Sequence, residues 1–235
     1  MPDNLKLSVI IPVYNEERTI LTIIERVEAV KLPQGIGKEI LVIDDGSTDQ
    51  TKTILKAIPA RPDLKIFYHD KNQGKTAAVK LGIAKVTGDI LVIQDADLEY
   101  NPQYFPALLQ PILDGKATVV YGSRFMGKIQ GMTFINRFAN TISNLTINIL
   151  YGSQITDFHT GYKMFRQEVI KNIPIESKNF TFDTEITAKI VRKGIRIYEI
   201  PIEYAARKSS EGKKITWGTA MESYLFLLRY RFSSS

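Results

Sequence analysis

Two aspartates separated by one small residue follow a short apolar run near the middle of the chain. The run is Ile90–Ile93, the aspartates are Asp95 and Asp97, and Glu99 stands two residues further on. Carboxylates this close repel one another unless a cation lies between them. Mg²⁺ prefers one or two carboxylates together with water and substrate phosphates, so the segment predicts a metal site with Glu99 as a third ligand. The alternative is that Asp97 or Glu99 caps the helix that follows.

A second acidic segment, DDGSTD, ends another apolar run and precedes a helix-compatible stretch. Asp45 and Gly46 are typical turn residues, and the polar residues after them can cap the helix. These roles do not account for Asp44, which belongs to the buried end of the run and needs a hydrogen-bond donor there. We therefore expect Asp44 to meet a base or a ribose.

A third segment, Asn72–Thr76, resembles the end of a P-loop. The pattern G-x-x-x-x-G-K-[ST] requires glycine at position 69, where this chain has His69, so a P-loop enzyme is not expected. Gly74 and Lys75 stand at the expected start of a helix and can face a phosphate. The alternative is that Gly74 serves only the turn.

A repeated strand-and-helix pattern positions these polar segments. The expected strands are Leu7–Val13, Glu39–Asp44, Leu64–His69, Ile90–Gln94 and Ala117–Gly122. The expected helices are Glu16–Val30, Asp49–Ala57, Lys75–Ala84 and Pro102–Leu113. The alternation predicts an α/β fold with a mostly parallel central sheet and helices on both faces. Such sheets bind ligands at the carboxyl ends of their strands, where the acidic segments stand.

The pattern is less regular after Gly122. We expect an amphipathic helix over Gly131–Gly152, turns over Thr156–Phe165, a helix over Phe182–Lys193, a half-exposed strand in IRIYEIPIEY and a final helix over Ile215–Tyr230. No clear linker interrupts the chain. We therefore expect one catalytic domain over residues 1–210, followed by a C-terminal amphipathic helix over residues 211–235.

Composition narrows the class of protein. The chain has 235 residues, 44% of them hydrophobic, and no cysteine. The absence of cysteine excludes disulfides, zinc–thiolate sites and cysteine nucleophiles. No N-terminal signal segment and no membrane-spanning apolar window is recognised, so we expect a cytoplasmic chain that is soluble or peripherally attached to a membrane.

The net charge of +6 is concentrated in the last fifth of the chain, where residues 189–235 carry ten Lys or Arg and four Asp or Glu. A basic end suggests an anionic partner there, such as phosphates or an acidic membrane surface, and we expect no nucleic-acid partner. The alternative is a solvated basic face.

Five segments in order resemble glycosyltransferase family 2: SVIIPVYNEE, EILVIDDGSTDQT, NQGKTAAVKLGIAKVTGDILVIQDADLEY, YGSRF and DFHTGYKMF. The resemblance covers about residues 7–205 and implies the GT-A fold, a Rossmann-like nucleotide-diphospho-sugar transferase fold. Within the family the chain is most similar to the dolichyl- or polyprenyl-phosphate hexose synthases, to which RKSSEGKKITW also belongs. The resemblance implies a metal-dependent, inverting transfer of mannose or glucose from a GDP- or UDP-sugar to a polyprenyl phosphate.

The resemblance also implies roles for individual residues. The nucleotide-sugar contacts would be Pro12, Tyr14, Glu16, Asp44, Asp45, Gly74, Lys75, Asp95, Ala96, Asp97, Arg124, Arg207 and Lys213. Asp95 and Asp97 would hold Mg²⁺ or Mn²⁺, while the family often has Gln at the position of Glu99. Arg137 would meet the phosphate of the lipid acceptor, and the alternative for each arginine is a surface ion pair.

The expected chemistry develops negative charge on the leaving nucleoside diphosphate, which a divalent cation and cationic side chains such as Arg124 stabilise. An acceptor phosphate is already ionised near neutral pH and needs no strong base. A hydroxyl acceptor would need one, and Asp157 is then the candidate. Transfer to a glycan or protein hydroxyl is therefore the main alternative, followed by a nucleotidyltransferase and a non-catalytic binding module.

The final helix can contact a membrane. Its apolar residues recur at helical spacing: Trp217, Met221, Tyr224, Leu225, Leu228 and Phe232. Basic residues stand at both of its ends. Such a segment can lie in a lipid interface, or pack onto its own domain, a second copy or a membrane-protein partner. The resemblance to enzymes with lipid acceptors favours the membrane.

Overall fold

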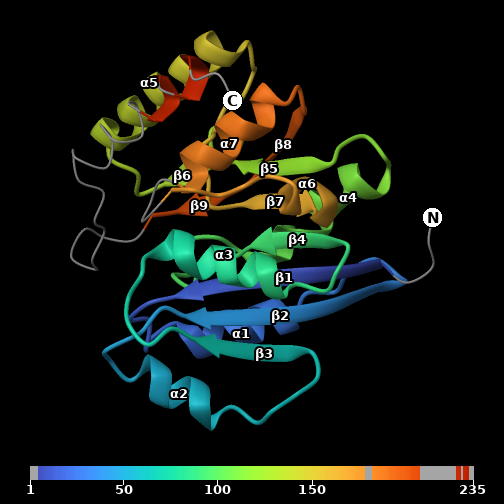
Figure 1. Cartoon of the computed structure of the whole chain (residues 1–235), viewed down its shortest axis with the longest axis vertical. Coiled ribbons are helices and arrows are strands. Elements are labelled where there is room, and N and C mark those ends of the chain that lie inside the picture. Colours follow the sequence, from blue (N-terminus) through green and yellow to red (C-terminus); the bar gives the residue numbers. More distant parts are fainter. Residues whose placement is uncertain (1–4, 178–181, 207–225, 229, 233–235) are drawn as a thin grey trace.

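A seven-stranded sheet runs through the middle of the molecule in this computed structural model, which describes residues 5–177, 182–206, 226–228 and 230–232 (Figure 1). The strand order is β3-β2-β1-β4-β7-β5-β8. The strands are β1 (Leu5–Val13), β2 (Ile36–Asp44), β3 (Leu64–Tyr68), β4 (Ile90–Ile93), β5 (Val119–Ser123), β7 (Lys163–Arg166) and β8 (Ile197–Pro201). The five strands expected from the sequence are all present.

Most neighbouring strands are parallel, which confirms the expected fold class. β1 pairs in parallel with β2 and β4, β2 with β3, and β5 with β8. The exception is β7, which lies between β4 and β5 and is antiparallel to both. The segment Thr156–Phe165, expected to be rich in turns, ends in this strand, which was not expected and covers Lys163–Arg166. The strand has only four residues and carries a buried lysine, so its pattern does not stand out.

Helices cover both faces of the sheet. They are α1 (Ile20–Glu28), α2 (Thr51–Ala57), α3 (Lys75–Lys85), α4 (Phe105–Leu113, after the 3-10 turn Pro102–Tyr104), α6 (Gln167–Lys171) and α7 (Phe182–Arg192). Alternate residues of β1 face opposite sides, so Val9 and Ile11 pack with α1 and α4 while Ile10 packs with α3. In Figure 1, α3, α6 and α7 lie in front of the sheet and α1 lies behind it.

The amphipathic helix expected over Gly131–Gly152 is α5, residues Phe134–Tyr151. Thr133 accepts a hydrogen bond from the backbone N–H of Asn136 at its start. Gly152 ends it with φ of +66°, a left-handed conformation that glycine adopts without strain. β6 (Ile129–Gln130) leads into α5 and pairs with β9 (Tyr204–Ala205). No helix in the described part of the chain is long and apolar enough to cross a bilayer.

Most of the expected C-terminal helix, and the domain boundary at residue 210, lie outside the described residues. The stretches 226–228 and 230–232 are helical. Leu227 is buried in a small cluster with Ile147 of α5 and Ala188 of α7. This part of the C-terminal helix therefore packs onto the domain itself.

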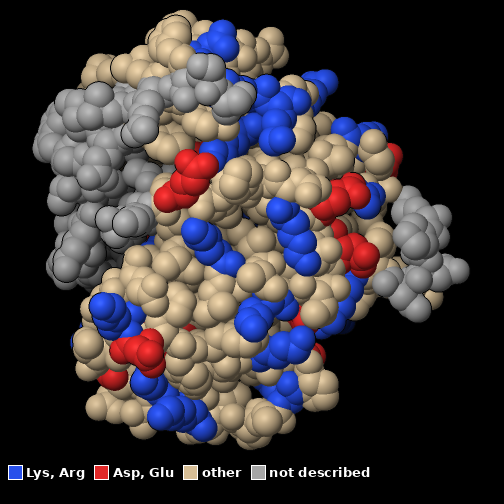
Figure 2. All heavy atoms as spheres, in the orientation of Figure 1, with Lys and Arg blue, Asp and Glu red and all other residues tan. Residues whose placement is uncertain are grey.

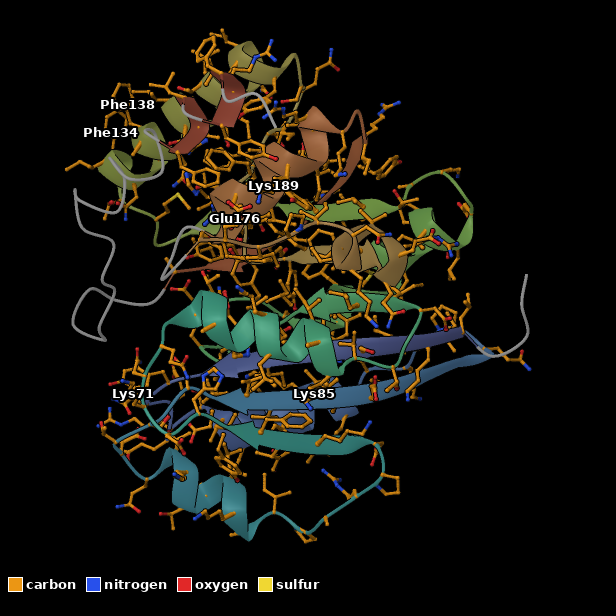
Figure 3. All side chains as sticks on the ribbon, in the orientation of Figure 1. Lys71, Lys85, Phe134, Phe138, Glu176 and Lys189 are labelled. Atoms are coloured by element: carbon orange, nitrogen blue, oxygen red, sulfur yellow. The ribbon has the colours of Figure 1, made fainter. Side chains whose placement is uncertain are left out.

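Part of the basic excess at the end of the chain is internal. Lys and Arg side chains are dispersed over the face that carries α3 and α7 (Figure 2). Lys189 of α7, however, is buried, with its Nζ atom 2.6 Å from Glu185 and 3.4 Å from Glu176 (Figure 3). Arg192 donates a hydrogen bond to the backbone oxygen of Tyr230. These two cations stabilise the packing around α7 and the C-terminal helix, so they are not free to form a surface for an anionic partner.

A buried carboxylate ties the amino-terminal halves of the strands together. Glu39 of β2 accepts hydrogen bonds from Ser8 Oγ and Thr87 N, both at 2.7 Å, and Lys65 and Lys6 lie 3.1 and 3.2 Å away. Burial alone would raise the pKa of Glu39, but the hydrogen bonds from Ser8, Thr87 and Lys65 outweigh it and lower the pKa to about 2. Glu39 is therefore charged in the folded protein at neutral pH.

Replacing Glu39 with Gln should lower the free energy of unfolding at pH 7 by about 1–3 kcal/mol, because the amide cannot satisfy all of these donors. A carboxylate with a depressed folded-state pKa stabilises above its unfolded value of 4.5 and loses that contribution as the pH falls toward 2. The difference between the variants should therefore shrink in acid, as measured by urea unfolding at several pH values. Glu25→Gln, on the exposed side of α1, is the control. Equal stability of Glu39→Gln and wild type at pH 7 would contradict the prediction.

Candidate active site

The carboxyl ends of β1, β2 and β4 carry the acidic segments to one edge of the sheet, on the left in Figure 1. The loops after β1 and β2 are joined directly. Asn15 N donates to Ser47 Oγ at 3.0 Å, and the Asn15 side chain accepts from Thr48 N at 2.8 Å. Asn15 has φ of +55°, which asparagine tolerates better than most residues. The expected gathering of these segments is confirmed.

Asp44 ends β2 and is completely buried. Its Oδ1 atom accepts a hydrogen bond from Ser47 N at 3.1 Å. Its Oδ2 atom has no hydrogen-bond partner among the described residues. A buried carboxylate oxygen without a donor is destabilising, so a hydrogen-bond donor of a ligand fits this position.

Asp45 orders the turn that leads into α3. Its carboxylate accepts hydrogen bonds from Gly74 N at 2.7 Å and Gln73 N at 3.0 Å, and His69 Nδ1 lies 2.6 Å away. Gly74 has φ of +90°, a backbone conformation that favours glycine. Asp45 and Gly74 therefore stabilise the turn. Their contact with a nucleotide stays a prediction.

Asp95 is paired with Lys75, the first residue of α3. The Lys75 Nζ atom lies 2.5 Å from Asp95 Oδ1, and the two side chains are 23% and 19% exposed. Burial alone would lower the pKa of Lys75, but the carboxylates of Asp95 and Asp183, and Asp97 beyond them, raise it above its usual value. Lys75 is therefore a cation held at the first aspartate of the expected metal site.

Asp97 lies in a tight turn after β4. Its Oδ1 atom accepts a hydrogen bond from Glu99 N at 3.1 Å, and Leu98 between them has φ of +62°. A leucine in the left-handed region is uncommon and marks a strained turn. The turn keeps Asp97 beside Asp95 at the edge of the sheet.

Glu99, the expected third metal ligand, is bound by a tyrosine. Its Oε2 atom accepts a hydrogen bond from the hydroxyl of Tyr204 at 2.5 Å. Within the described residues, no group of three or more His, Cys, Asp or Glu is placed to hold a metal ion. Asp95 and Asp97 stay the expected oxygen ligands, and the role of Glu99 as a third ligand stays a prediction. Two carboxylates completed by substrate phosphates and water fit the preference of Mg²⁺.

Arg124 and Asp157 form a buried bidentate pair. Arg124 Nε and Nη2 each lie 2.7 Å from an oxygen of Asp157, and Arg124 N donates to Oδ2 at 2.9 Å. Burial alone would lower the pKa of Arg124, but Tyr100 and Asp157 raise it, so the guanidinium stays charged. The pair orients the guanidinium of Arg124. The role of Asp157 as a base for a hydroxyl acceptor stays a prediction.

Three tyrosines that were not assigned a role from the sequence connect these parts. The ring of Tyr100 lies 4.9 Å from that of Tyr162 and 5.2 Å from that of Tyr204, measured between centroids. The hydroxyl of Tyr100 accepts a hydrogen bond from Gly161 N at 2.8 Å. Tyr162 donates to Gln94, whose side chain in turn donates to the backbone oxygen of Asp95. The tyrosines therefore join the Asp95 turn to the loop before β7.

A second charged pair lies behind the site. Lys163 of β7 is completely buried, and its Nζ atom lies 2.6 Å from Asp183 Oδ1. His159 is close to this pair, and burial, helped by the charges of Lys163 and Arg124, lowers its pKa to about 4 despite the opposing effect of Asp183. His159 is therefore neutral at physiological pH. The buried lysine gave no signal in the sequence, because it lies in a strand that the pattern did not reveal.

The remaining predicted contacts on the β1 side lie at the same edge. Pro12 is buried in β1, and Tyr14 directly after the strand is exposed. Glu16 is half-buried and accepts a hydrogen bond from the side chain of Thr19 at 2.7 Å. Ala96, between the two aspartates, is buried. Of these side chains, that of Tyr14 is the most accessible to a ligand.

The predicted phosphate contacts outside this edge are less defined. Arg137 is exposed on α5. Arg207 and Lys213 lie outside the described residues. The roles implied for these three residues stay predictions.

Gly161 leaves no room for a side chain beside the metal site, so its replacement tests the site directly. A Cβ atom at this position would lie 2.5 Å from Asp95 Oδ2 and 2.9 Å from the ring of Tyr100. Gly161→Ala should therefore displace Asp95 and weaken Mn²⁺ binding by about 10- to 100-fold, as measured by electron paramagnetic resonance of free Mn²⁺.

Gly37→Ala is the matched control, since its new Cβ would lie 3.9 Å from its nearest neighbours, in ordinary contact. Unchanged Mn²⁺ affinity in Gly161→Ala would show that Asp95 is not a ligand in the expected place.

The sequence matches the family described as Glycosyl transferase family 2 over residues 8–173. A dolichol-phosphate mannosyltransferase of Pyrococcus furiosus is 29% identical over 213 residues, which are 89% of this chain and 59% of that protein. An undecaprenyl-phosphate 4-deoxy-4-formamido-L-arabinose transferase of Enterobacter sp. is 30% identical over 88% of this chain and 62% of its own length. The chain therefore spans less than two thirds of these two relatives.

Solved structures share the fold at lower identity. Glucosyl-3-phosphoglycerate synthase from Mycobacterium tuberculosis, in complex with Mn²⁺, UDP and phosphoglyceric acid, has a TM-score of 0.76 at 20% identity, covering 98% of this chain and 80% of that one. The same protein with Mg²⁺ and UDP has a TM-score of 0.74 at 20% identity, covering 97% and 79%. At this identity the likeness shows a common fold.

Proposed function

The chain belongs to glycosyl transferase family 2 and has the GT-A fold, and on that premise we propose that it transfers a hexose from a nucleotide-diphosphate sugar to a polyprenyl phosphate. The donor would be GDP- or UDP-linked mannose or glucose. Relatives named for transfer to dolichol, dodecaprenyl and undecaprenyl phosphates support this acceptor. Transfer to a glycan or protein hydroxyl is the alternative within the same family.

The nucleotide fits the edge formed by the loops after β1 and β2. The unpartnered Oδ2 atom of buried Asp44 can accept a hydrogen bond from a base or ribose group. Tyr14 is exposed at the same edge. Binding of the nucleotide sugar should therefore give a hydrogen-bond donor to a carboxylate oxygen that has none among the described residues.

Asp95 and Asp97 would hold Mg²⁺ or Mn²⁺. When bound there, a divalent cation supplies charge neutralisation for the leaving nucleoside diphosphate. Arg124, kept charged and oriented by Asp157, can stabilise negative charge on the same side of the site.

The engagement of Asp157 is the observation that most favours a phosphate acceptor. Both of its oxygens accept hydrogen bonds from Arg124, so the base candidate taken from the sequence is already engaged in an ion pair, which supports an acceptor that needs no base. A phosphate oxygen that is already ionised can form the new bond to the anomeric carbon as the bond to the diphosphate breaks. This direct displacement inverts the configuration at the sugar.

The outer face of α5 supports peripheral attachment to a membrane. Phe134 and Phe138 are 82% and 57% exposed and their rings stack at 6.4 Å on the outside of the helix (Figure 3). Further exposed apolar residues on α5 are Ile135, Ile142, Leu145 and Ile149. An exposed apolar stripe of this kind can enter the interface of a bilayer, where a lipid acceptor resides.

Asp97→Ala should lower hexose transfer by about 100- to 1000-fold while the protein stays folded, because one of the two metal ligands is lost. The assay supplies UDP- and GDP-linked mannose and glucose with Mg²⁺ or Mn²⁺ and a short polyprenyl phosphate, and detects lipid-linked product. Asp63→Ala, an exposed aspartate just before β3, is the control. Transfer at the wild-type rate in Asp97→Ala would rule out the proposed metal site.

Replacing both Phe134 and Phe138 with Asp should weaken binding to vesicles of phosphatidylglycerol and phosphatidylcholine by about tenfold or more, because apolar area no longer enters the lipid. Co-sedimentation measures the effect. Leu21→Asp, at an exposed apolar position of α1, should leave vesicle binding unchanged. Equal sedimentation of the double variant and the wild type would refute membrane contact through α5.

A further inference from the structure

Lys75 and the proposed metal compete for the same carboxylate. The Lys75 ammonium is 2.5 Å from Asp95 Oδ1, in direct contact with the oxygen that a divalent cation would use. A cation of charge +2 at Asp95 would repel an ammonium in the same place, and the partial burial of both side chains strengthens the repulsion. Simultaneous contact of Lys75 and the metal with this oxygen is therefore electrostatically unfavourable.

A second carboxylate lies within electrostatic reach of Lys75. Asp183, in the first turn of α7, is the largest attraction on Lys75 after Asp95, and Lys75 in turn stabilises the charged form of Asp183. Asp183 is also bound by Lys163 on its other side. Asp95, Lys75, Asp183 and Lys163 thus form a series of alternating charges that runs from the edge of the sheet into the core.

Only one of the two lysines in this series has freedom to move. Lys163 is completely buried, donates to the backbone oxygen of Thr160, and lies 4.9 Å above the ring of Tyr121. Lys75 is 23% exposed, and its flexible four-carbon stem lets the ammonium shift without any change in the backbone. A displaced Lys75 therefore has a negative partner nearby in Asp183.

We propose that Lys75 is a resident counter-cation that neutralises Asp95 in the metal-free protein and moves toward Asp183 when a divalent cation binds. This inference rests on the metal site of the proposed function. In this proposal Asp183 and Lys163 are positioning residues. Asp183 is the second binding position of the Lys75 ammonium, and Lys163 holds Asp183 in place. Metal affinity is then set by a competition inside the protein as well as by the two aspartate ligands.

The test is Mn²⁺ binding to the full chain without nucleotide, followed by electron paramagnetic resonance of free Mn²⁺. Lys75→Met removes the competitor and should bind Mn²⁺ about tenfold tighter than wild type. Asp183→Asn removes the place that receives the ammonium and should bind Mn²⁺ about threefold or more weaker. Lys80→Met, the same substitution at an exposed position of α3, should match wild type.

Weaker or unchanged Mn²⁺ binding in Lys75→Met would overturn the proposal, because a purely structural lysine would damage the site when removed. If Lys75→Met does not fold, Lys75→Gln replaces it, with a polar group beside Asp95. This variant should also bind Mn²⁺ more tightly than wild type. Wild-type affinity in Asp183→Asn would overturn Asp183 as the destination. If no form of the protein binds Mn²⁺, wild type included, the metal site itself is overturned. If wild type binds Mn²⁺ but Lys75→Met does not bind it more tightly, only the role of Lys75 is overturned.

Discussion

The compensation of buried negative charge is the constraint on which the rest of the site depends. A parallel sheet brings Asp44, Asp95 and Asp97 to one edge, where they repel one another unless each has a donor or a cation. In the folded protein, each of these carboxylates has a different partner. Lys75 contacts Asp95, and backbone amides contact Asp44 and Asp97. Within the part of the chain that the structure describes, one oxygen of Asp44 has no donor. The site is thus stable without a ligand yet retains carboxylates for one.

The aromatic cluster gives this edge its rigidity. Tyr100 packs between Tyr162 and Tyr204, and their hydroxyls bond Gly161, Gln94 and Glu99. Arg124 lies 5.0 Å above the ring of Tyr204 and is held by Asp157. The turn with Asp95 and Asp97 and the loop with Arg124 therefore share one support, and a small shift of either would displace the other. Such second contacts commonly tune how ligands are held.

The sequence predicted the elements that are defined by local patterns. The apolar runs before Asp44 and Asp95 are strands, and the helix that ends at Gly152 is present with the expected ending. These features follow from periodicity and from residue types within a few positions of each other. The same patterns placed the acidic segments at one edge, because parallel strands end on the same side.

The partners of individual side chains could not be predicted in this way. Glu99 bonds Tyr204, which is 105 positions away, and Arg124 bonds Asp157, 33 positions away, so only the packed fold brings them together. Both contacts bear on an interpretation, because Glu99 is engaged by a tyrosine and Asp157 by an arginine. The position of β7 between β4 and β5, which buries Lys163 in the sheet, could likewise not be predicted from a four-residue pattern.

We propose that this chain, whose candidate base is paired with Arg124, uses an acceptor that is already ionised. A comparison of a short polyprenyl phosphate with the matching polyprenol as acceptors, with the same nucleotide sugar and Mg²⁺, tests this proposal. We expect lipid-linked hexose from the phosphate and none from the alcohol. Efficient transfer to the alcohol would contradict it, because the site would then have to supply a base that the Arg124–Asp157 pair does not provide.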